Sequence, residues 1–234
     1  DPSVIEFERC LAARKTQPAS EARTAFEQFL REFPLSTKRD AAYEVLGEIN
    51  AAEFFSAPLT EENTYVVKSG DSVSRVSART KVPTELLVFL NRLDGRFLHP
   101  NQRLLAPQCS FRMVIQQKTR RVVLYDGDKF FRQYPAAEWP GGGQGKPGAA
   151  PKQTGRVTEK RAFDDTGSVT PAQLRYRDAH HMILVNIPGH SLYTLPADPK
   201  AIVQRPPGGG IGMAPWHMGE ISVLLPAGAP VSID

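Results

Sequence analysis

The sequence is short of cysteine, lacks long hydrophobic runs and has no concentrated block of positive charge. Its two cysteines, Cys10 and Cys109, allow at most one disulfide; they could pair in an oxidising compartment or both stay free. No stretch approaches the roughly 20 consecutive apolar residues that a membrane-spanning helix requires. The 234 residues are therefore expected to form two or three compact domains.

The charge balance argues against a nucleic-acid partner. The formal net charge is +4, which gives only a mild bias toward anionic partners. Lys118, Arg120 and Arg121 form a short basic group, either solvated hairpin charges or a contact to an anionic polymer. No spacing of histidines and carboxylates indicates a metal site, and we expect no cofactor.

Residues 1–60 are predicted to be helical. Phe26, Phe29, Leu30 and Phe33 fall on one helix face, and a second apolar face follows the break at Pro34. Ser36 is a plausible cap for that later helix, and Phe7 and Leu11 suggest an earlier one. Together they predict a small helical hairpin that resembles one tetratricopeptide-type unit.

Residues 63–107 have the order strand, helix, helix, strand. The first strand, Tyr65 to Lys68, leads into a Gly-Asp-Ser turn, a helix opens at Val82-Pro83-Thr84, and an apolar strand returns before Pro107. This segment resembles a LysM domain, a carbohydrate-binding module. The resemblance implies a shallow groove for N-acetylated glycans between the loop after the first strand and the loop before the last.

Carried over to this chain, the groove residues fall into two groups. The glycan-binding candidates are Gly70, Asp71, Ser72 and Val73 on one side and Asn91, Arg92 and Leu93 on the other. Asp71 or Ser72 could instead serve only to cap a helix, and Asn91 only to end one.

Residues 111–234 change to a strand pattern. Strands are expected at 112–116, 121–125 and 129–134, with Asp126-Gly127 as a hairpin turn, followed by a loop rich in Gly and Pro at 138–153. Thr154-Gly155 leads into a further strand, and a terminal strand ends at Ile233. In this order of elements the segment resembles an L,D-transpeptidase domain. The predicted fold class is thus α+β with several domains: helical hairpin, LysM module and a mostly-β C-terminal domain.

The active-site motif of that family is degenerate here. Gly210 stands where the family has its cysteine nucleophile, and Gly212 stands where it has an arginine. The histidine that acts as the base is matched by Pro188 by residue type or by Tyr193 by spacing. Glycine has no side chain that could attack a carbonyl, and neither proline nor a phenol near pKa 10 is a useful base at neutral pH.

The resemblance supports two functions. The first is a noncatalytic, exported protein of the periplasm or cell envelope that binds peptidoglycan through its glycan, with its stem peptide or a protein as further partner. The chain begins at Asp1-Pro2 rather than at Met, so an export signal or anchor could have been removed. The alternative is an active transpeptidase or carboxypeptidase with an unrecognised nucleophile. His190 and Ser191 are nearby, but neighbours on a strand point to opposite faces.

Overall fold

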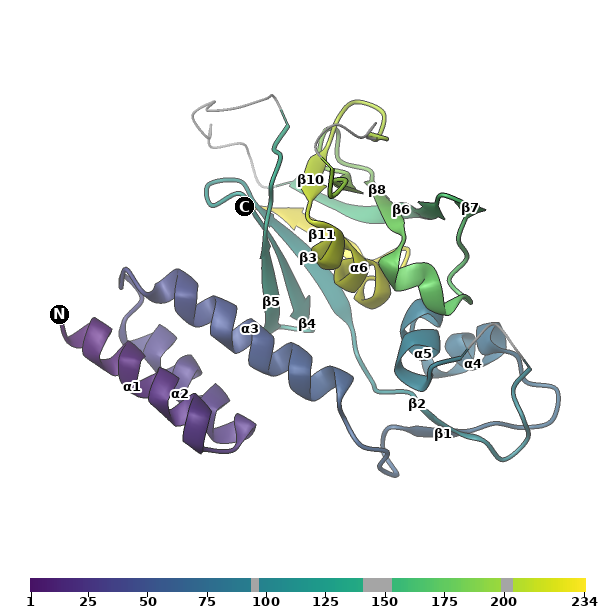
Figure 1. The fold of residues 1–234 in the computed structure, drawn as a ribbon, viewed down its shortest axis with the longest axis horizontal. Helices are drawn as coiled ribbons and strands as arrows, with labels where there is room; N and C mark the ends of the chain where they lie inside the picture. Colours follow the sequence, from purple (N-terminus) through teal and green to yellow (C-terminus); the bar gives the residue numbers. More distant parts are fainter. Residues whose placement is uncertain (94–96, 141–152, 199–203) are drawn as a thin grey trace. The chain divides into compact units, whose positions relative to one another are not determined.

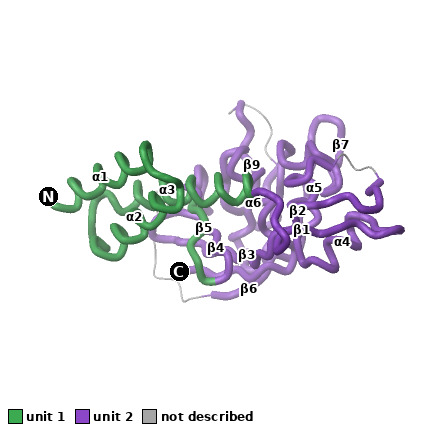
Figure 2. The backbone as a smooth tube through the Cα atoms, turned by 90° about the horizontal axis from the view of Figure 1, so that it is seen from below, with its two compact units in different colours: residues 1–57, 128–133 green, residues 58–127, 134–234 purple. Residues whose placement is uncertain are grey.

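The computed structural model describes residues 1–93, 97–140, 153–198 and 204–234, and the chain divides into two compact units. The first unit contains residues 1–57 and 128–133, and the second contains residues 58–127 and 134–234. Figure 1 shows the elements, and Figure 2 shows the units in different colours. Much of the loop expected at 138–153 lies outside the described residues.

The first unit has three helices: α1 (Pro2–Thr16), α2 (Ala19–Glu32) and α3 (Arg39–Phe55). Phe7, Phe26 and Phe29 meet in its core, with ring centroids 5.8 to 6.1 Å apart between Phe7 and each of the others. The helical region is confirmed, but it has one helix more than a hairpin. Residues 128–133 also pack here, where Asn50 Nδ2 donates to the Phe130 and Phe131 carbonyls at 3.1 Å.

The predicted cap of the third helix is wrong. Lys38, not Ser36, is the residue at its N-cap, and no side chain caps it. The Ser36 hydroxyl instead accepts from the Lys38 amide at 3.0 Å and donates to the Ser3 hydroxyl at 2.8 Å. Ser36 therefore holds the turn before α3 against the start of α1.

Residues 64–105 form a βααβ module. Strands β1 (Thr64–Val66) and β2 (Arg103–Leu105) pair antiparallel around α4 (Val73–Thr80) and α5 (Thr84–Asn91). Apolar side chains from each helix and from β2 are buried between them, chiefly Val76, Leu86 and Leu104. The predicted strand and helix order is confirmed.

The remaining described residues form a mixed sheet against which a 10-residue helix packs. The strands are β3 (Phe111–Gln116), β4 (Arg121–Asp126), β5 (Lys129–Pro135), β6 (Gln153–Asp164), β7 (Gly167–Ser168), β8 (His180–Val185), β9 (Leu192–Thr194), β10 (Ile211–Met213) and β11 (Pro230–Ile233). Within the second unit their order is β10-β9-β8-β6-β11-β3-β4, with β7 beside β6. Helix α6 (Pro215–Leu224), whose residues from 217 to 224 are all buried, packs on β8 and beside the 3-10 helix η1 (Leu174–Asp178).

The βααβ module is attached to the sheet domain by a buried ion pair. Lys160 on β6 donates to Glu85 Oε1 on α5 at 2.7 Å, and their side chains are only 5% and 12% exposed. The same ammonium group donates to the carbonyls of Ser222 and Leu225 at the end of α6, at 2.6 and 2.8 Å. Nearby, the Arg177 guanidinium lies 4.6 Å from the Phe89 ring centroid. These contacts fix the module on the domain.

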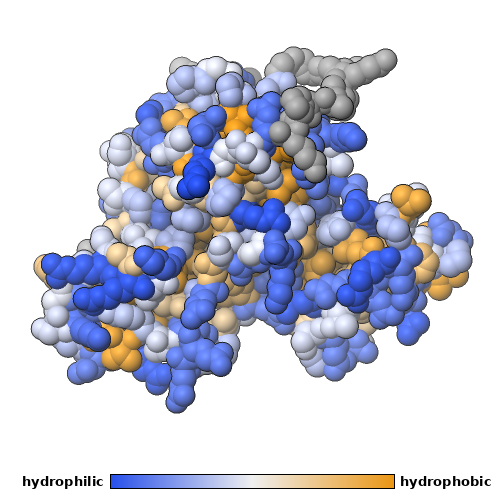
Figure 3. Space-filling view, turned by 180° about the vertical axis from the view of Figure 1, so that it is seen from behind, coloured by the Kyte–Doolittle hydropathy of each residue, from blue (hydrophilic) through white to orange (hydrophobic). Residues whose placement is uncertain are grey.

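The surface is mostly hydrophilic on the face that Figure 3 shows, with small hydrophobic areas. The exposed large apolar side chains are Ile5, Leu35, Leu59, Val66, Phe97, Leu174 and Trp216. Among the described residues, no helix combines the length and apolar character that crossing a bilayer would need. Both cysteines are free thiols, so the pairing left open by the sequence is not formed in this structure.

Candidate functional site

The segment with the degenerate motif forms a short parallel strand pair. Strand β10 runs beside β9, and the register places Tyr193 opposite Gly212. Pro188 lies instead in the turn after β8, where its carbonyl accepts a hydrogen bond from His190 Nδ1 at 2.7 Å. Of the two residues matched to the family's base, Tyr193 is the one that lies beside the motif.

Gly210 has no space for a side chain. A Cβ atom at this position would lie 2.4 Å from the Ser191 carbonyl oxygen and 2.7 Å from Pro206 Cγ. The Ser191 carbonyl is held in place because it accepts from the Ile211 amide at 2.8 Å. Since real Cβ contacts stay above 3.0 Å, a cysteine here would force the backbone apart. The thiol is absent, and so is the room for it.

Gly212 is paired with the segment around Glu138. The amides of Ala137 and Glu138 donate to the Gly212 carbonyl at 2.9 and 3.0 Å, and the Gly212 amide donates to the Glu138 carbonyl at 3.0 Å. A Cβ atom at Gly212 would lie 2.8 Å from Glu138 Cβ. The position of the family's arginine is therefore covered by a chain segment that the sequence analysis assigned to a loop.

A hydrogen-bonded cluster of Tyr193, Glu138 and Arg205 lies beside this pairing. The Tyr193 hydroxyl donates to Glu138 Oε2 at 2.5 Å, and Arg205 donates to the same oxygen at 3.0 Å and to the Tyr193 hydroxyl at 3.2 Å. The bond from Tyr193, and secondarily that from Arg205, lowers the pKa of Glu138. Burial and the Glu138 carboxylate raise the pKa of Tyr193. The phenol therefore stays protonated and donates, so it is no proton acceptor.

Neither His190 nor His181 supplies an accessible nucleophile and base pair. His190 Nε2 lies 3.2 Å from Gln117 Nε2, and the Ser191 hydroxyl accepts from the Val185 amide at 3.2 Å. His181 Nε2 does lie 3.2 Å from the Ser222 hydroxyl. However, His181 is 1% exposed and Ser222 is fully buried. Burial lowers the pKa of His181 to about 4, and a substrate cannot reach this pair in the folded chain.

On the first side of the predicted glycan groove, the polar side chains also hold the loop. Gly70 has a φ of +80°, which favours glycine. The Asp71 carboxylate accepts from the Tyr65 hydroxyl at 2.7 Å and the Lys68 amide at 2.9 Å, and it pairs with Arg79. The Lys68 amide bond and then the Tyr65 bond lower the pKa of Asp71. Ser72 caps α4, which begins at Val73, by accepting from the Arg75 amide at 3.3 Å.

The second side of that groove is dominated by one amide side chain. Asn91 Nδ2 donates to the Leu87 and Leu105 carbonyls at 2.9 Å, and its Oδ1 accepts from the Leu105 amide at 2.7 Å. Arg92 ends α5 with a φ of +51° and is exposed, and Leu93 is buried. Backbone bonds from the Val67 amide to the Gln102 carbonyl and from the Asn101 amide to the Val67 carbonyl join the two loops.

Several residues of these sites could not be predicted from the sequence. Glu138, Arg205, Glu85 and Lys160 act through partners far along the chain, and no local pattern marks them. Phe97 could have been identified from the sequence, because it is an aromatic residue in the loop before the last strand of the module. Its side chain is 94% exposed, which suits stacking on a sugar ring.

Comparison with known proteins identifies the module. Residues 65–107 match the model of the LysM domain, so this part is a peptidoglycan-binding module. A comparison with curated proteins finds none that matches.

Solved structures similar to this chain include L,D-transpeptidases. The enzyme from Mycobacterium smegmatis is 12% identical with a TM-score of 0.35, over 76% of this chain and 88% of that one. L,D-transpeptidase 1 of Mycobacterium tuberculosis is 14% identical with a TM-score of 0.32, over 57% and 67%. The enzyme from Stackebrandtia nassauensis is 10% identical with a TM-score of 0.34, over 90% and 76%. All three scores are low, and the likeness says nothing about which residues act.

Proposed function

We propose that this protein binds peptidoglycan in the cell envelope and does not catalyse acyl transfer. The observation that carries the proposal is the filled position at Gly210, where a Cβ atom would lie 2.4 Å from the Ser191 carbonyl oxygen. The LysM match over residues 65–107 supports the binding part. The motif resemblance supports the noncatalytic part, because the degenerate positions are those that carry the family's chemistry.

Acyl transfer on a stem peptide needs a nucleophile, a base and stabilisation of the developing oxyanion. At the motif the nucleophile position is a glycine without side-chain space, and the base position is a phenol that donates to Glu138 at 2.5 Å. Arg205, the cation beside the motif, is paired with the Glu138 carboxylate at 3.0 Å, so its charge is already compensated and does not stabilise a developing oxyanion. Each of the three requirements fails for its own physical reason.

The glycan is expected to lie between the loop at 67–73 and the described residues 91–93 and 97–99. Backbone groups and short polar side chains can bond an acetamido group, while apolar atoms cover a sugar face. Because Asp71 and Asn91 have structural partners, we assign the direct contacts chiefly to the backbone around Gly70 and to the exposed Arg92 and Phe97. This assignment separates residues that shape the groove from residues that touch sugar.

Sedimentation with purified sacculi tests the binding proposal. Deleting the LysM module is unsuitable because Glu85 and α5 are part of the packing of the sheet domain. The variant Phe97→Ala removes an exposed ring, and Leu35→Ala is a matched control because Leu35 is 96% exposed in the first unit. We expect the intact chain and Leu35→Ala to sediment equally and Phe97→Ala to sediment less. An intact chain that stays in the supernatant contradicts the proposal.

A carbapenem tests the noncatalytic part independently. A thiol or hydroxyl nucleophile with a competent base forms a stable acyl adduct with this reactive amide. We expect the mass of the intact protein to stay unchanged after prolonged incubation. An adduct mapped to residues 111–234 would overturn the noncatalytic assignment and leave the glycan assignment standing.

A further inference from the structure

His181 on β8 is a buried titratable side chain outside the glycan groove and the degenerate motif. It is 1% exposed and lies between η1 and α6, two elements that pack against each other. Its Nε2 atom lies 3.2 Å from the Ser222 hydroxyl on α6 and 3.4 Å from the Arg177 carbonyl on η1. Among the described residues, its buried Nδ1 atom has no hydrogen-bond partner. One nitrogen of the ring thus bridges two elements, and the other is unbonded.

The hydrogen bonds around the ring decide which nitrogen carries the hydrogen at neutral pH. The Ser222 hydroxyl has one hydrogen and donates it to the Gly219 carbonyl at 3.0 Å. Its oxygen therefore accepts from His181 Nε2, and the same hydrogen points toward the Arg177 carbonyl. We assign the hydrogen to Nε2 from this network, which leaves a lone pair on Nδ1.

The charged and titratable neighbours of His181 do not compensate a second proton. Among the described residues, no carboxylate bonds to the ring, because Glu85 on α5 pairs with Lys160 on β6 at 2.7 Å. The Lys160 ammonium and the adjacent His180 both oppose a positive charge on His181. The Tyr176 ring on η1 lies 4.8 Å from the His181 ring. Burial and the Glu85 charge raise the pKa of Tyr176, so its phenol stays neutral.

The neighbours on the remaining elements are neutral. Ser222 on α6 and Thr194 on β9 contribute hydroxyl groups, and the Thr194 hydroxyl bonds to the His181 backbone. Burial, opposed by the bond to the Arg177 carbonyl and assisted by the Lys160 charge, lowers the pKa of His181 to about 4. Its value in an opened chain is the usual 6.5. The closed structure therefore excludes a proton that the opened structure binds.

The contact between η1 and α6 is too close for water to enter. A Cβ atom at Gly219 on α6 would lie 2.2 Å from the Arg177 carbonyl oxygen, so the two backbones touch here. This carbonyl is the one that faces His181 Nε2. Because Nδ1 is itself out of reach of solvent, water can hydrate a charged ring only if these elements separate.

The same two elements attach the LysM module, because α5 packs on both η1 and α6. Arg177 offers its carbonyl to His181 and its guanidinium to the Phe89 ring on α5, 4.6 Å from the centroid. Ser222 offers its hydroxyl to His181 and its carbonyl to Lys160, which holds α5 through its ion pair. A separation at His181 therefore loosens the attachment of the module.

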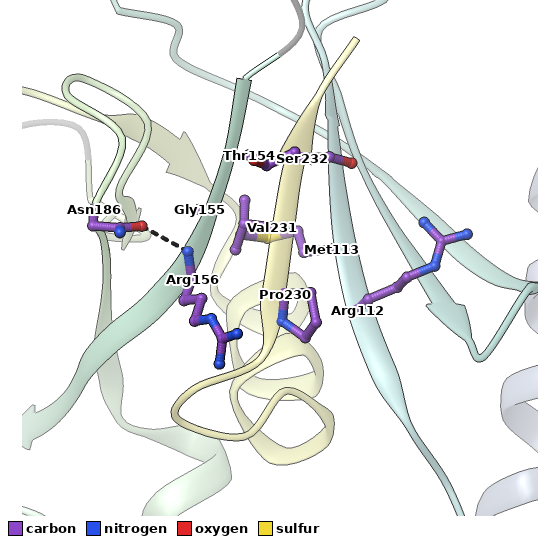
Figure 4. A pocket seen from close by; sticks show the side chains of 9 residues that line it. All are labelled: Arg112, Met113, Thr154, Gly155, Arg156, Asn186, Pro230, Val231 and Ser232. Atoms are coloured by element: carbon purple, nitrogen blue, oxygen red, sulfur yellow. Dashed lines mark hydrogen bonds between the residues drawn. The ribbon is translucent and has the colours of Figure 1, made fainter.

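Strand β8 stays fixed on the sheet when these contacts open. It pairs with β6 on one side and with β9 on the other. Beyond its end, Asn186 Oδ1 accepts from the Arg156 amide at 2.6 Å (Figure 4). Residues 217–224 of α6 are all buried, whereas η1 is at the surface with Leu174 40% exposed. The element that can move is therefore η1.

We propose that His181 makes the attachment of the LysM module sensitive to acid: a solvent proton binds the Nδ1 lone pair, η1 moves away from α6, and α5 loosens from the sheet domain. The stabilisation by the neutral ring is fully present above pH 6.5 and is lost as the pH falls from 6.5 toward about 4. At neutral pH the module is held on the domain. In mild acid it moves independently of the domain.

Hydrogen exchange on the full chain at pH 7 and pH 5 tests the proposal, with amide protection corrected for the intrinsic effect of pH. At pH 5 most carboxyl groups stay ionised, so histidine titration dominates the comparison. His181→Gln removes the titrating ring and keeps an amide donor for Ser222. His180→Gln is the matched control, because it removes the neighbouring histidine, which is partly exposed and stacks on Phe163.

We expect the protection of α5 and η1 to fall about 20-fold from pH 7 to pH 5 in the intact chain and in His180→Gln. This factor follows from pKa values of 6.5 in the open state and about 4 in the closed state. Strands β3 and β4 should keep their protection, and His181→Gln should show no such fall. Unchanged protection in the intact chain, the same fall in His181→Gln, or an equal fall in β3 and β4 would each overturn the proposal.

NMR titration of the His181 ring in the intact chain gives a second test that needs no variant. We expect the ring to stay neutral while η1 is protected from exchange, and to gain its proton together with the loss of that protection. A ring that titrates near pH 6.5 while η1 stays fully protected would contradict the proposal.

Discussion

Lys160 and Glu85 form a buried ion pair at 2.7 Å that joins the sheet domain to the LysM module. The ammonium group also donates to the Ser222 and Leu225 carbonyls, so three partners surround it. Burial lowers the pKa of Lys160, while the Glu85 carboxylate opposes that shift. A lysine at 5% exposure is tolerated only because each of these partners is present.

Removing one member of this pair should destabilise the protein strongly. Lys160→Met or Glu85→Gln leaves a buried group unpaired and is expected to cost about 3 to 5 kcal/mol in the free energy of unfolding. The double variant Lys160→Met with Glu85→Gln should recover much of that loss, because it removes both charges. Chemical denaturation measures all four chains. Additive losses in the double variant would show that the two side chains do not act as a pair.

Substitution at Gly210 should be more costly than at its neighbour. Gly210→Ala places a Cβ atom against the Ser191 carbonyl, and overpacking of this kind costs about 1 to 3 kcal/mol, with the upper end expected here. Gly209→Ala is the control, because no atom lies within 4 Å of a Cβ atom placed there. Only the φ of +81° at Gly209 opposes a side chain, and this is expected to reduce the free energy of unfolding by about 1 kcal/mol. Thermal unfolding compares them. Equal melting temperatures would mean that the motif has room for a side chain after all.

Tyr193 should control the acid stability contributed by Glu138. The pKa of Glu138 is lowered below its usual 4.5, chiefly by the bond from Tyr193. A carboxyl group whose pKa is lowered in the folded state stabilises the fold above pH 4.5. This contribution is lost as the pH falls through the pKa that the group has in the folded state. Tyr193→Phe should raise the Glu138 pKa toward 4.5 and reduce that acid loss, whereas Tyr43→Phe should not. NMR titration of the carboxyl groups measures the pKa of Glu138 in both variants. An unchanged Glu138 pKa in Tyr193→Phe would contradict the hydrogen bond from Tyr193.

Asn91 should act on stability rather than on glycan contact. Asn91→Ala removes the hydrogen bonds to Leu87 and Leu105 and leaves their buried groups unsatisfied, for about 1 to 3 kcal/mol. Glycan affinity measured well below the melting temperature should change little, while Arg92→Ala should affect binding more than stability. A large loss of glycan affinity with little loss of stability in Asn91→Ala would show instead that Asn91 contacts the sugar.

Both cysteines should be slow to alkylate in the folded protein. Burial raises the pKa of Cys10, and burial followed by the charge of Asp126 raises that of Cys109 to about 12. Because the thiolate is the reactive form, iodoacetamide at neutral pH should modify them slowly before unfolding and rapidly afterwards. Mass spectrometry should count two thiols with or without reductant. A reductant-dependent count would show that the cysteines pair in the purified protein.

Much of the fold follows from local signals. The Gly-Asp-Ser turn and the Val-Pro-Thr opening of α5 mark the LysM module, because caps and turns depend on neighbouring residues. Alternation of apolar residues placed β3, β4 and β5 within one residue of their observed bounds. Local periodicity indicated all three helical segments of the first unit, but it did not show that they pack as three helices rather than as a hairpin.

The features that define the site depend on distant pairs. Glu138 followed a strand and opened a Gly- and Pro-rich stretch, so nothing local indicated its pairing with Gly212. No local pattern marks Lys160, because its partners, Glu85 and the carbonyls at the end of α6, lie far along the chain. Sequence spacing also left Pro188 and Tyr193 as equal candidates, and only the β9 and β10 register separates them.

The central claim is that the folded chain holds peptidoglycan without changing it. The direct measurement is incubation of the full chain with tetrapeptide-bearing muropeptides, followed by mass analysis of the peptides and of the protein. We predict unaltered muropeptides and an unmodified chain at every time point. A released terminal amino acid, a crosslinked dimer or an acylated protein would contradict the account.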